Sequence, residues 1–176
     1  MTAVDLGLLL IRLVVGLTFA AHGAQKAFGW WAGPGWDGWQ NAIGRMGFRP
    51  AGLFAAISIA AELVGGLFLA LGAFTPFAAA FLVAQSTVII VKVHSPNGFW
   101  NKSSGIEFPL ALGGAALALG LTGAGAVSFD GVEGFGVSDA VRIVVAMAGI
   151  VCGVIALAVP VAAASSSNSG PTATAR

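Results

Sequence analysis

The sequence has one cysteine, Cys152, no tyrosine and only two histidines among its 176 residues. A single cysteine excludes an intramolecular disulfide and a Cys-x-x-Cys redox pair. Any redox chemistry would therefore need a bound cofactor or a partner protein. Cys152 itself lies in an apolar segment, and we interpret it as a small core or lipid-facing residue.

Charge is scarce as well. Charged residues make up 9% of the chain, whereas soluble domains carry about 25%. Hydrophobic residues reach 57% and glycines number 26, which is typical of membrane proteins, where small residues let helices approach closely. The net charge of +1 gives no sign of a nucleic-acid-binding surface.

Apolar segments predict five helices, and the longer ones suffice to cross a hydrocarbon core of about 30 Å. They cover residues 5–28, 51–73, 76–93, 106–122 and 138–163. The predicted fold class is an all-α integral membrane protein with a four-helix transmembrane core in residues 1–130. Residues 131–163 add an acidic loop and a C-terminal transmembrane helix, and residues 164–176 form a disordered tail. The first segment does not resemble a cleaved signal, because Arg12 interrupts it and no lysine or arginine precedes it.

Two local patterns refine this outline. Residues 29–49 hold four of the five tryptophans, and Trp36, Trp39 and Ile43 recur at helical spacing. This predicts a short interfacial helix lying in the headgroup region. Thr75 is predicted to be the N-cap of the third helix, with Pro76 at its first position.

Positive charge is uneven between the two ends of the predicted bundle. With five spans, one end carries Lys26, Arg45, Arg49, Lys92 and Lys102, whereas the other has Arg142 beside Asp5, Asp130, Glu133 and Asp139. The positive-inside rule then places the lysine- and arginine-rich end in the cytoplasm, the N-terminus outside and the C-terminus in the cytoplasm.

Several ionisable residues lie within the apolar segments, where a charge is costly unless it is paired or faces a cavity. At 100° per residue, Arg12, His22 and Lys26 share one face of the first helix. At a rise of about 1.5 Å per residue, Arg12 and Glu62 lie at depths about one turn apart. This predicts an Arg12–Glu62 ion pair, which could also serve only to lock two helices together.

The remaining polar residues gather toward the same end, and they predict a polar pocket there. We expect His22, Glu62 and His94 as catalytic residues and Lys26, Gln85 and Glu107 as cofactor-binding residues. Each has a structural alternative. Lys26 could extend to the headgroups, Gln85 could bridge helices, and His94 could lie in a loop. Glu107 stands three residues after Ser104, the spacing of a capping box.

Metal chemistry has little support in this sequence. Two histidines on separate helices could ligate a haem axially, but two histidines in such a chain need no special cause, and haem is not favoured. The ligand types and spacings of a structural zinc site are missing.

Seven short stretches resemble the DoxX family of small bacterial membrane proteins. They are LIRL (10–13), HGAQKAFGW (22–30), ELVGG (62–66), GAFTP (72–76), HSPNGF (94–99), GIEFPL (105–110) and LTGAG (121–125). The resemblance implies a four-helix core in the bacterial inner membrane. It also implies family-typical polar positions at Arg12, His22, Lys26, Glu62, His94 and Glu107.

The resemblance points to redox work, because some members resemble the small membrane subunit of a thiosulfate:quinone oxidoreductase. Others are implicated as anchors in complexes that handle thiol and oxidative stress. The first hypothesis is thus a redox subunit whose pocket binds a quinone and whose soluble partner docks on the cytoplasmic side. The alternatives are a non-enzymatic membrane scaffold or assembly factor, and a small lipid- or solute-binding transporter. A homo-oligomer fits any of these.

Overall fold

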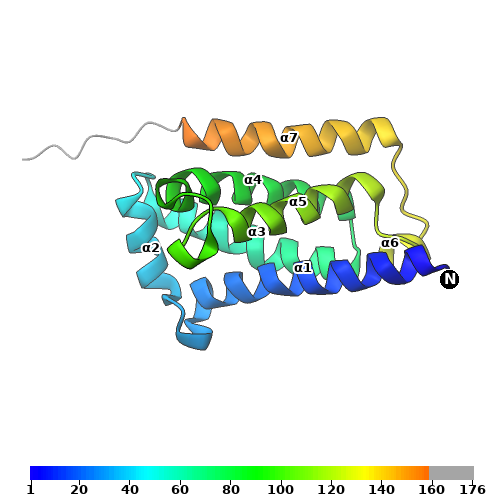
Figure 1. The fold of residues 1–176 in the computed structure, drawn as a ribbon, viewed down its shortest axis with the longest axis horizontal. Helices are drawn as coiled ribbons and strands as arrows, with labels where there is room; N and C mark the ends of the chain where they lie inside the picture. The colour runs from blue at the N-terminus through cyan, green and yellow to red at the C-terminus, as the bar shows by residue number, and fades with distance from the viewer. Residues whose placement is uncertain (159–176) are drawn as a thin grey trace, which may run out of the picture.

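The computed structural model describes residues 1–158, and every regular element in that range is helical. Long helices run side by side along the molecule: α1 (Ala3–Phe28), α3 (Ala51–Leu71), α4 (Thr75–Ile89), α5 (Glu107–Thr122) and α7 (Asp139–Leu157) (Figure 1). Helix α2 (Gly35–Arg45) lies across one end of this bundle, and the one-turn helix α6 (Phe129–Val132) lies at the other end, near the N-terminus. Helix α4 continues as a π-helical turn, Ile90–His94.

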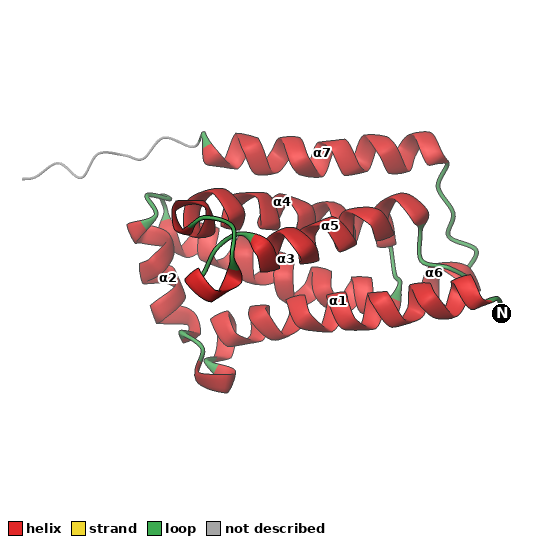
Figure 2. Cartoon of the chain, in the orientation of Figure 1, coloured by secondary structure: helices red, strands yellow, loops and turns green. Residues whose placement is uncertain are grey.

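Short 3-10 turns complete the structure, at Trp30–Ala32, Ser95–Asn97 and Asn101–Ser103. Figure 2 shows that the loops gather at the two ends of the bundle. The part of the chain described here contains four helical stretches long and apolar enough to cross a membrane: Ala3–Phe28, Ala51–Leu71, Thr75–Asn97 and Asp139–Leu157. The predicted fold class, an all-α multi-pass membrane protein, is therefore confirmed.

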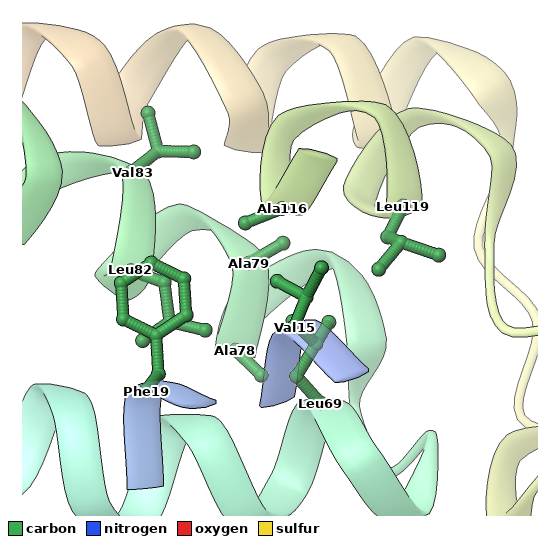
Figure 3. Close-up of a cluster of buried hydrophobic side chains, with 9 residues drawn as sticks. All are labelled: Val15, Phe19, Leu69, Ala78, Ala79, Leu82, Val83, Ala116 and Leu119. Carbon is green, nitrogen blue, oxygen red and sulfur yellow. The ribbon is translucent and has the colours of Figure 1, made fainter. Parts of the chain in front are cut away.

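The packing is that of a protein in lipid. Buried apolar side chains from α1, α3, α4 and α5 meet in one cluster at the centre of the bundle (Figure 3). Large apolar side chains also cover the outside of the helices, among them Leu10, Val14 and Leu17 on α1 and Ile143 and Val144 on α7. Exposed apolar surface this extensive needs a hydrocarbon environment.

Helices α1 and α3 touch backbone to backbone. A Cβ atom on Gly16 would lie 2.5 Å from the Ala70 nitrogen, and one on Gly23 would lie 2.5 Å from the Leu63 nitrogen. Gly66 of α3 makes the same kind of contact with α1, because a Cβ atom on Gly66 would lie 2.6 Å from the Ala20 nitrogen. Only glycine permits this approach, so these glycines fix how the two antiparallel helices align.

Helix α7 packs on the outside of α4 in a similar way. Gly149 and Gly153 bring their backbones against Ala80 and Ala84 of α4. The predicted C-terminal helix therefore exists as a helix over residues 139–157. Its predicted end at residue 163 and the predicted tail, 164–176, lie outside the described residues. That α7 crosses the membrane, and that α2 lies in the headgroups, remain predictions.

One helix start differs from the prediction. Thr75 is the first residue of α4, and the N-cap is Phe74, which has a left-handed backbone (φ 47°). The predicted N-cap role of Thr75 was wrong, because its hydroxyl donates to Asp130, 2.7 Å away, and does not accept from its own helix. Pro76 does lie in the first turn.

The glycine contact between α1 and α3 can be tested by substitution. Gly66→Ala should lower the free energy of unfolding by about 1–3 kcal/mol, because the added methyl group overpacks a backbone contact. Gly114→Ala in α5 is the matched control, since no atom lies within 4 Å of its Cβ position. It should leave stability unchanged or raise it by up to about 1 kcal/mol. Thermal unfolding in one detergent compares them, and equal behaviour would contradict the contact.

Candidate functional site

A cavity of about 230 Å³ lies between the helices at the end of the bundle that carries α2, whose Trp39 lines it. All the long helices except α7 contribute to its wall, together with α2 and the π turn. Its lining residues are Phe19, His22, Lys26, Trp39, Glu62, Ser86, Ile89, Val93, His94, Phe108, Pro109 and Leu112. The walls are largely apolar, so a few polar side chains face a region of low dielectric.

An ion pair forms part of this wall. The Lys26 Nζ donates to Glu62 Oε1 at 2.5 Å, and the two residues are only 9% and 2% exposed. The ammonium also lies 4.2 Å from the centroid of the Trp39 ring, a cation–π contact. Lys26 therefore turns into the bundle, and the alternative in which it extends to the headgroups is wrong.

The site retains unused hydrogen-bonding capacity. Within residues 1–158, six buried side-chain atoms lack a hydrogen-bond partner, and three of them belong to residues that line this cavity. They are the Trp39 Nε1, the Glu62 Oε2 and the Ser86 Oγ. Buried polar atoms are normally paired, so each such atom calls for an explanation. Here a donor, an acceptor and a hydroxyl belong to residues that line the same cavity.

The two histidines differ in their surroundings. His22 meets the edge of the Phe108 ring, with ring centroids 5.9 Å apart. His94 Nδ1 lies 2.6 Å from the Ser104 carbonyl oxygen. A carbonyl oxygen only accepts, so Nδ1 carries the proton and Nε2 of the neutral ring is an acceptor. The π turn that ends in His94 adds a residue to the helical turn, a feature often found at functional sites.

Two predicted site residues lie off the cavity, and Gln85 is the nearer of them. It donates to Ser58 Oγ at 2.7 Å and to Glu62 Oε1 at 3.3 Å, so it links helices and supports the carboxylate from behind. Its side chain lines a neighbouring hollow of about 110 Å³, which shares Trp39 with the first. The structure thus gathers His22, Lys26, Glu62 and His94 around one cavity and places Gln85 next to it.

Glu107 does not join them. Its Oε2 accepts from the Asn101 backbone N–H at 2.8 Å, so it closes the loop before α5. The expected capping box with Ser104 is also wrong, because Ile106 is the N-cap residue and Ser104 has a left-handed backbone (φ 62°). Glu107 was expected in the pocket because of its position along the chain. Its hydrogen bond to the loop before α5 instead keeps it outside the cavity.

The predicted Arg12–Glu62 ion pair is wrong. Arg12 is only 1% exposed, but its Nη2 donates to the Val127 carbonyl at 2.5 Å. The reason is the alignment of α1 with α3. Because Gly23 meets Leu63, Glu62 is level with the turn that holds Lys26, and Arg12 lies far along α1, beside Gly72.

Asp130, which was not among the predicted site residues, organises that far end. Its Oδ1 accepts from the Phe74 N–H at 2.7 Å, and its Oδ2 accepts from the Thr75 N–H at 2.9 Å. Its own N–H donates to the Gly72 carbonyl at 2.9 Å, and its charge acts on the Arg12 guanidinium. A carboxylate is favourable at the start of a helix. Several acidic residues could take this place at the start of α4, and the sequence does not show which of them folds back to it.

This structure defines a class: an integral, multi-pass membrane protein whose helices surround a largely apolar pocket with a few polar side chains. Comparison with protein families matches the family described as DoxX over residues 7–95, and the chain belongs to that family. The match runs from α1 through the π turn and includes all four charged or histidine residues of the cavity. Comparisons with curated proteins and with solved structures find no match.

The buried ion pair yields a double-substitution test. Lys26→Met should lower the free energy of unfolding by about 3 kcal/mol, because it leaves the Glu62 charge buried without a partner. Adding Glu62→Gln should recover part of that loss, since no lone charge remains. Lys92→Met is the control. It removes a half-buried lysine outside the cavity and should cost less than about 1 kcal/mol. Independent, additive effects in denaturation experiments would contradict the pairing.

Asp130 gives a second test, at the other end. Asp130→Asn keeps the shape of the side chain but replaces one of two carboxylate oxygens, each of which accepts from one backbone N–H group, with an NH2 donor, so it should cost about 1.5–3 kcal/mol. Hydrogen exchange at Phe74 and Thr75 should accelerate. Glu133→Gln changes an exposed carboxylate three residues away and should alter neither quantity. Unchanged exchange at both Phe74 and Thr75 in the Asp130→Asn variant would rule out the capping role.

Proposed function

We propose that the cavity binds the headgroup of a membrane quinone and that the protein acts as the membrane subunit of a redox system. The observation that supports this best is that Trp39, Glu62 and Ser86, which line one largely apolar hollow, each carry a buried polar atom without a hydrogen-bond partner in the described part of the chain. Apolar walls with a few placed polar groups are the usual form of a small-molecule site. A quinone ring, apolar on its faces and polar at its oxygens, matches that pattern.

The size of the cavity favours a small ring. Sites for drug-sized ligands measure about 300–1,000 Å³, and this cavity has about 230 Å³. A single aromatic ring with oxygen substituents suits this volume better than a large macrocycle. The Trp39 N–H and the Ser86 hydroxyl offer hydrogen bonds to a ring oxygen, and the free Glu62 oxygen offers an acceptor to a ring hydroxyl.

When bound, a quinone supplies two-electron chemistry coupled to proton uptake and release. The chain has groups that suit the proton part. His94 Nε2 is an acceptor in the neutral ring and a donor in the protonated one, because Nδ1 already binds Ser104. Glu62 can hold a proton on its free oxygen while Lys26 and Gln85 keep the other oxygen in place. Lys26 balances the carboxylate charge whenever that proton leaves.

Electrons would come from a partner, because the single cysteine, Cys152, lies on the exposed face of α7 and has no second thiol to pair with. We place this partner at the end of the bundle that carries α2, where Arg45 and Arg49 line an open polar hollow of about 430 Å³. The positive-inside rule makes this end cytoplasmic in a bacterial inner membrane, with the N-terminus outside. With α7 as a fifth span, the C-terminus emerges on the same cytoplasmic side.

A second candidate function, a membrane anchor or scaffold, rests on this same hollow and not on the cavity. The hollow beside Arg45 and Arg49 suits an acidic protein surface, and a membrane anchor would need no ligand in the cavity. Two sets of substitutions distinguish the two functions. If the protein is only a scaffold, Arg45→Gln with Arg49→Gln abolishes co-purification with its partner, and Glu62→Gln has no effect on any activity of the complex.

Ligand binding provides the direct test. A benzoquinone with a decyl tail should bind the purified protein in detergent, and Glu62→Gln should weaken that binding by about tenfold or more, as expected for a lost charge-assisted hydrogen bond. Glu107→Gln is the matched control, because it changes a carboxylate at the same end that lies outside the cavity. It should leave the dissociation constant unchanged.

Calorimetric titration measures both variants against the unaltered protein. Failure of the unaltered protein to bind the quinone would overturn the proposed function. Equal weakening by Glu62→Gln and Glu107→Gln would place the ligand elsewhere.

A further inference from the structure

His22 separates two hollows. On its inner side lies the cavity with Lys26 and Glu62. On its outer side, an open groove of about 580 Å³ follows the surface of α1. The groove is lined by Leu13, Val14, Leu17, Thr18, Ala21, His22, Gln25 and Trp31. His22 is the residue common to both linings, so the two hollows meet at its side chain.

The partition between the hollows is thin. The Phe108 side chain of α5 meets the His22 ring edge-on. Phe108 is 42% exposed and yet lines the cavity, so one of its faces is inside and another is outside. Side chains with this exposure change rotamer within nanoseconds. The seam between α1 and α3, by contrast, is closed by backbone contact at Gly16, Gly23 and Gly66. Of these two seams, the one between α1 and α5 is the easier route into the cavity.

The groove has the chemistry of a hydrocarbon site. Its two uncharged polar side chains are already engaged with backbone carbonyls. Thr18 donates to the Val14 carbonyl at 2.7 Å, and Gln25 donates to the Trp31 carbonyl at 3.5 Å. The other walls are apolar except for His22 at the junction, and the groove lies along a helix long and apolar enough to cross the membrane. It offers mainly apolar contact area.

We propose that the ligand carries a hydrocarbon tail, that this tail lies in the α1 groove, and that the ligand enters sideways from the bilayer by displacing Phe108 from His22. This rests on the proposed function, because the headgroup occupies the internal cavity. Because the two hollows meet at His22, the groove holds the tail of the same ligand whose headgroup occupies the cavity. Tailed quinones would then be selected over short, water-soluble ones.

Two ligands separate this proposal from the function on which it rests: a methoxy-substituted benzoquinone without a tail, and the same ring with a decyl tail. Ala21→Trp adds an indole ring to the groove at a residue that does not line the cavity. It should weaken binding of the decyl ligand by about tenfold, the equivalent of losing about two buried methylene groups, and leave the tail-less ligand unaffected. Leu10→Trp is the matched control, on the same helix but outside the groove, and should change neither.

The rate of binding tests the route. Phe108→Ala should speed association of the decyl ligand in stopped-flow experiments, and Phe108→Trp should slow it. If the unaltered protein binds neither ligand, the proposed function fails. If it binds both equally well and Ala21→Trp has no effect, the function stands and the tail groove is overturned. Association rates that are the same in both Phe108 variants would overturn the sideways route.

Discussion

The backbone contact between α1 and α3 is the constraint on which the rest of the structure depends. Gly16, Gly23 and Gly66 leave no room for a side chain between the two helices, so only one alignment packs well. That alignment brings Lys26 of α1 to Glu62 of α3 and sends Arg12 to the opposite end, beside Gly72. Two buried charges meet in the interior because small residues elsewhere leave the helices no other register.

The two ends of the bundle use buried charge differently. At the Arg12 end, Asp130 and the guanidinium bind backbone groups, the N–H groups of Phe74 and Thr75 and the carbonyl of Val127. These hydrogen bonds stabilise the tight turn between α3 and α4. At the Lys26 end, the carboxylate keeps one oxygen free beside a hollow. Buried charge is costly at either end. Only the arrangement at the Lys26 end leaves hydrogen-bonding capacity for another molecule, because one Glu62 oxygen has no partner among the described residues.

The sequence predicted periodic features well. Helical spacing placed His22 and Lys26 on one face, and both line the cavity; apolar length predicted the membrane fold. Features that depend on how two elements meet were not predictable. The Arg12–Glu62 pair assumed that depth could be counted from helix ends, whereas glycine contacts set the alignment. Glu107 and Asp130 lie in or beside loops, where no period applies. Their hydrogen-bond partners, Asn101 and Thr75, could be identified only from the folded structure.

The π turn at the end of α4 makes the position of His94 depend on a single residue. Residues Ile90–His94 hold one residue more than a regular turn would. If the same five residues wound as a regular α-helix, His94 would be turned by about 100° around the helix axis from its present direction. The wider turn therefore sets which way the imidazole points, whereas Lys26 and Glu62 are positioned by the contact between α1 and α3.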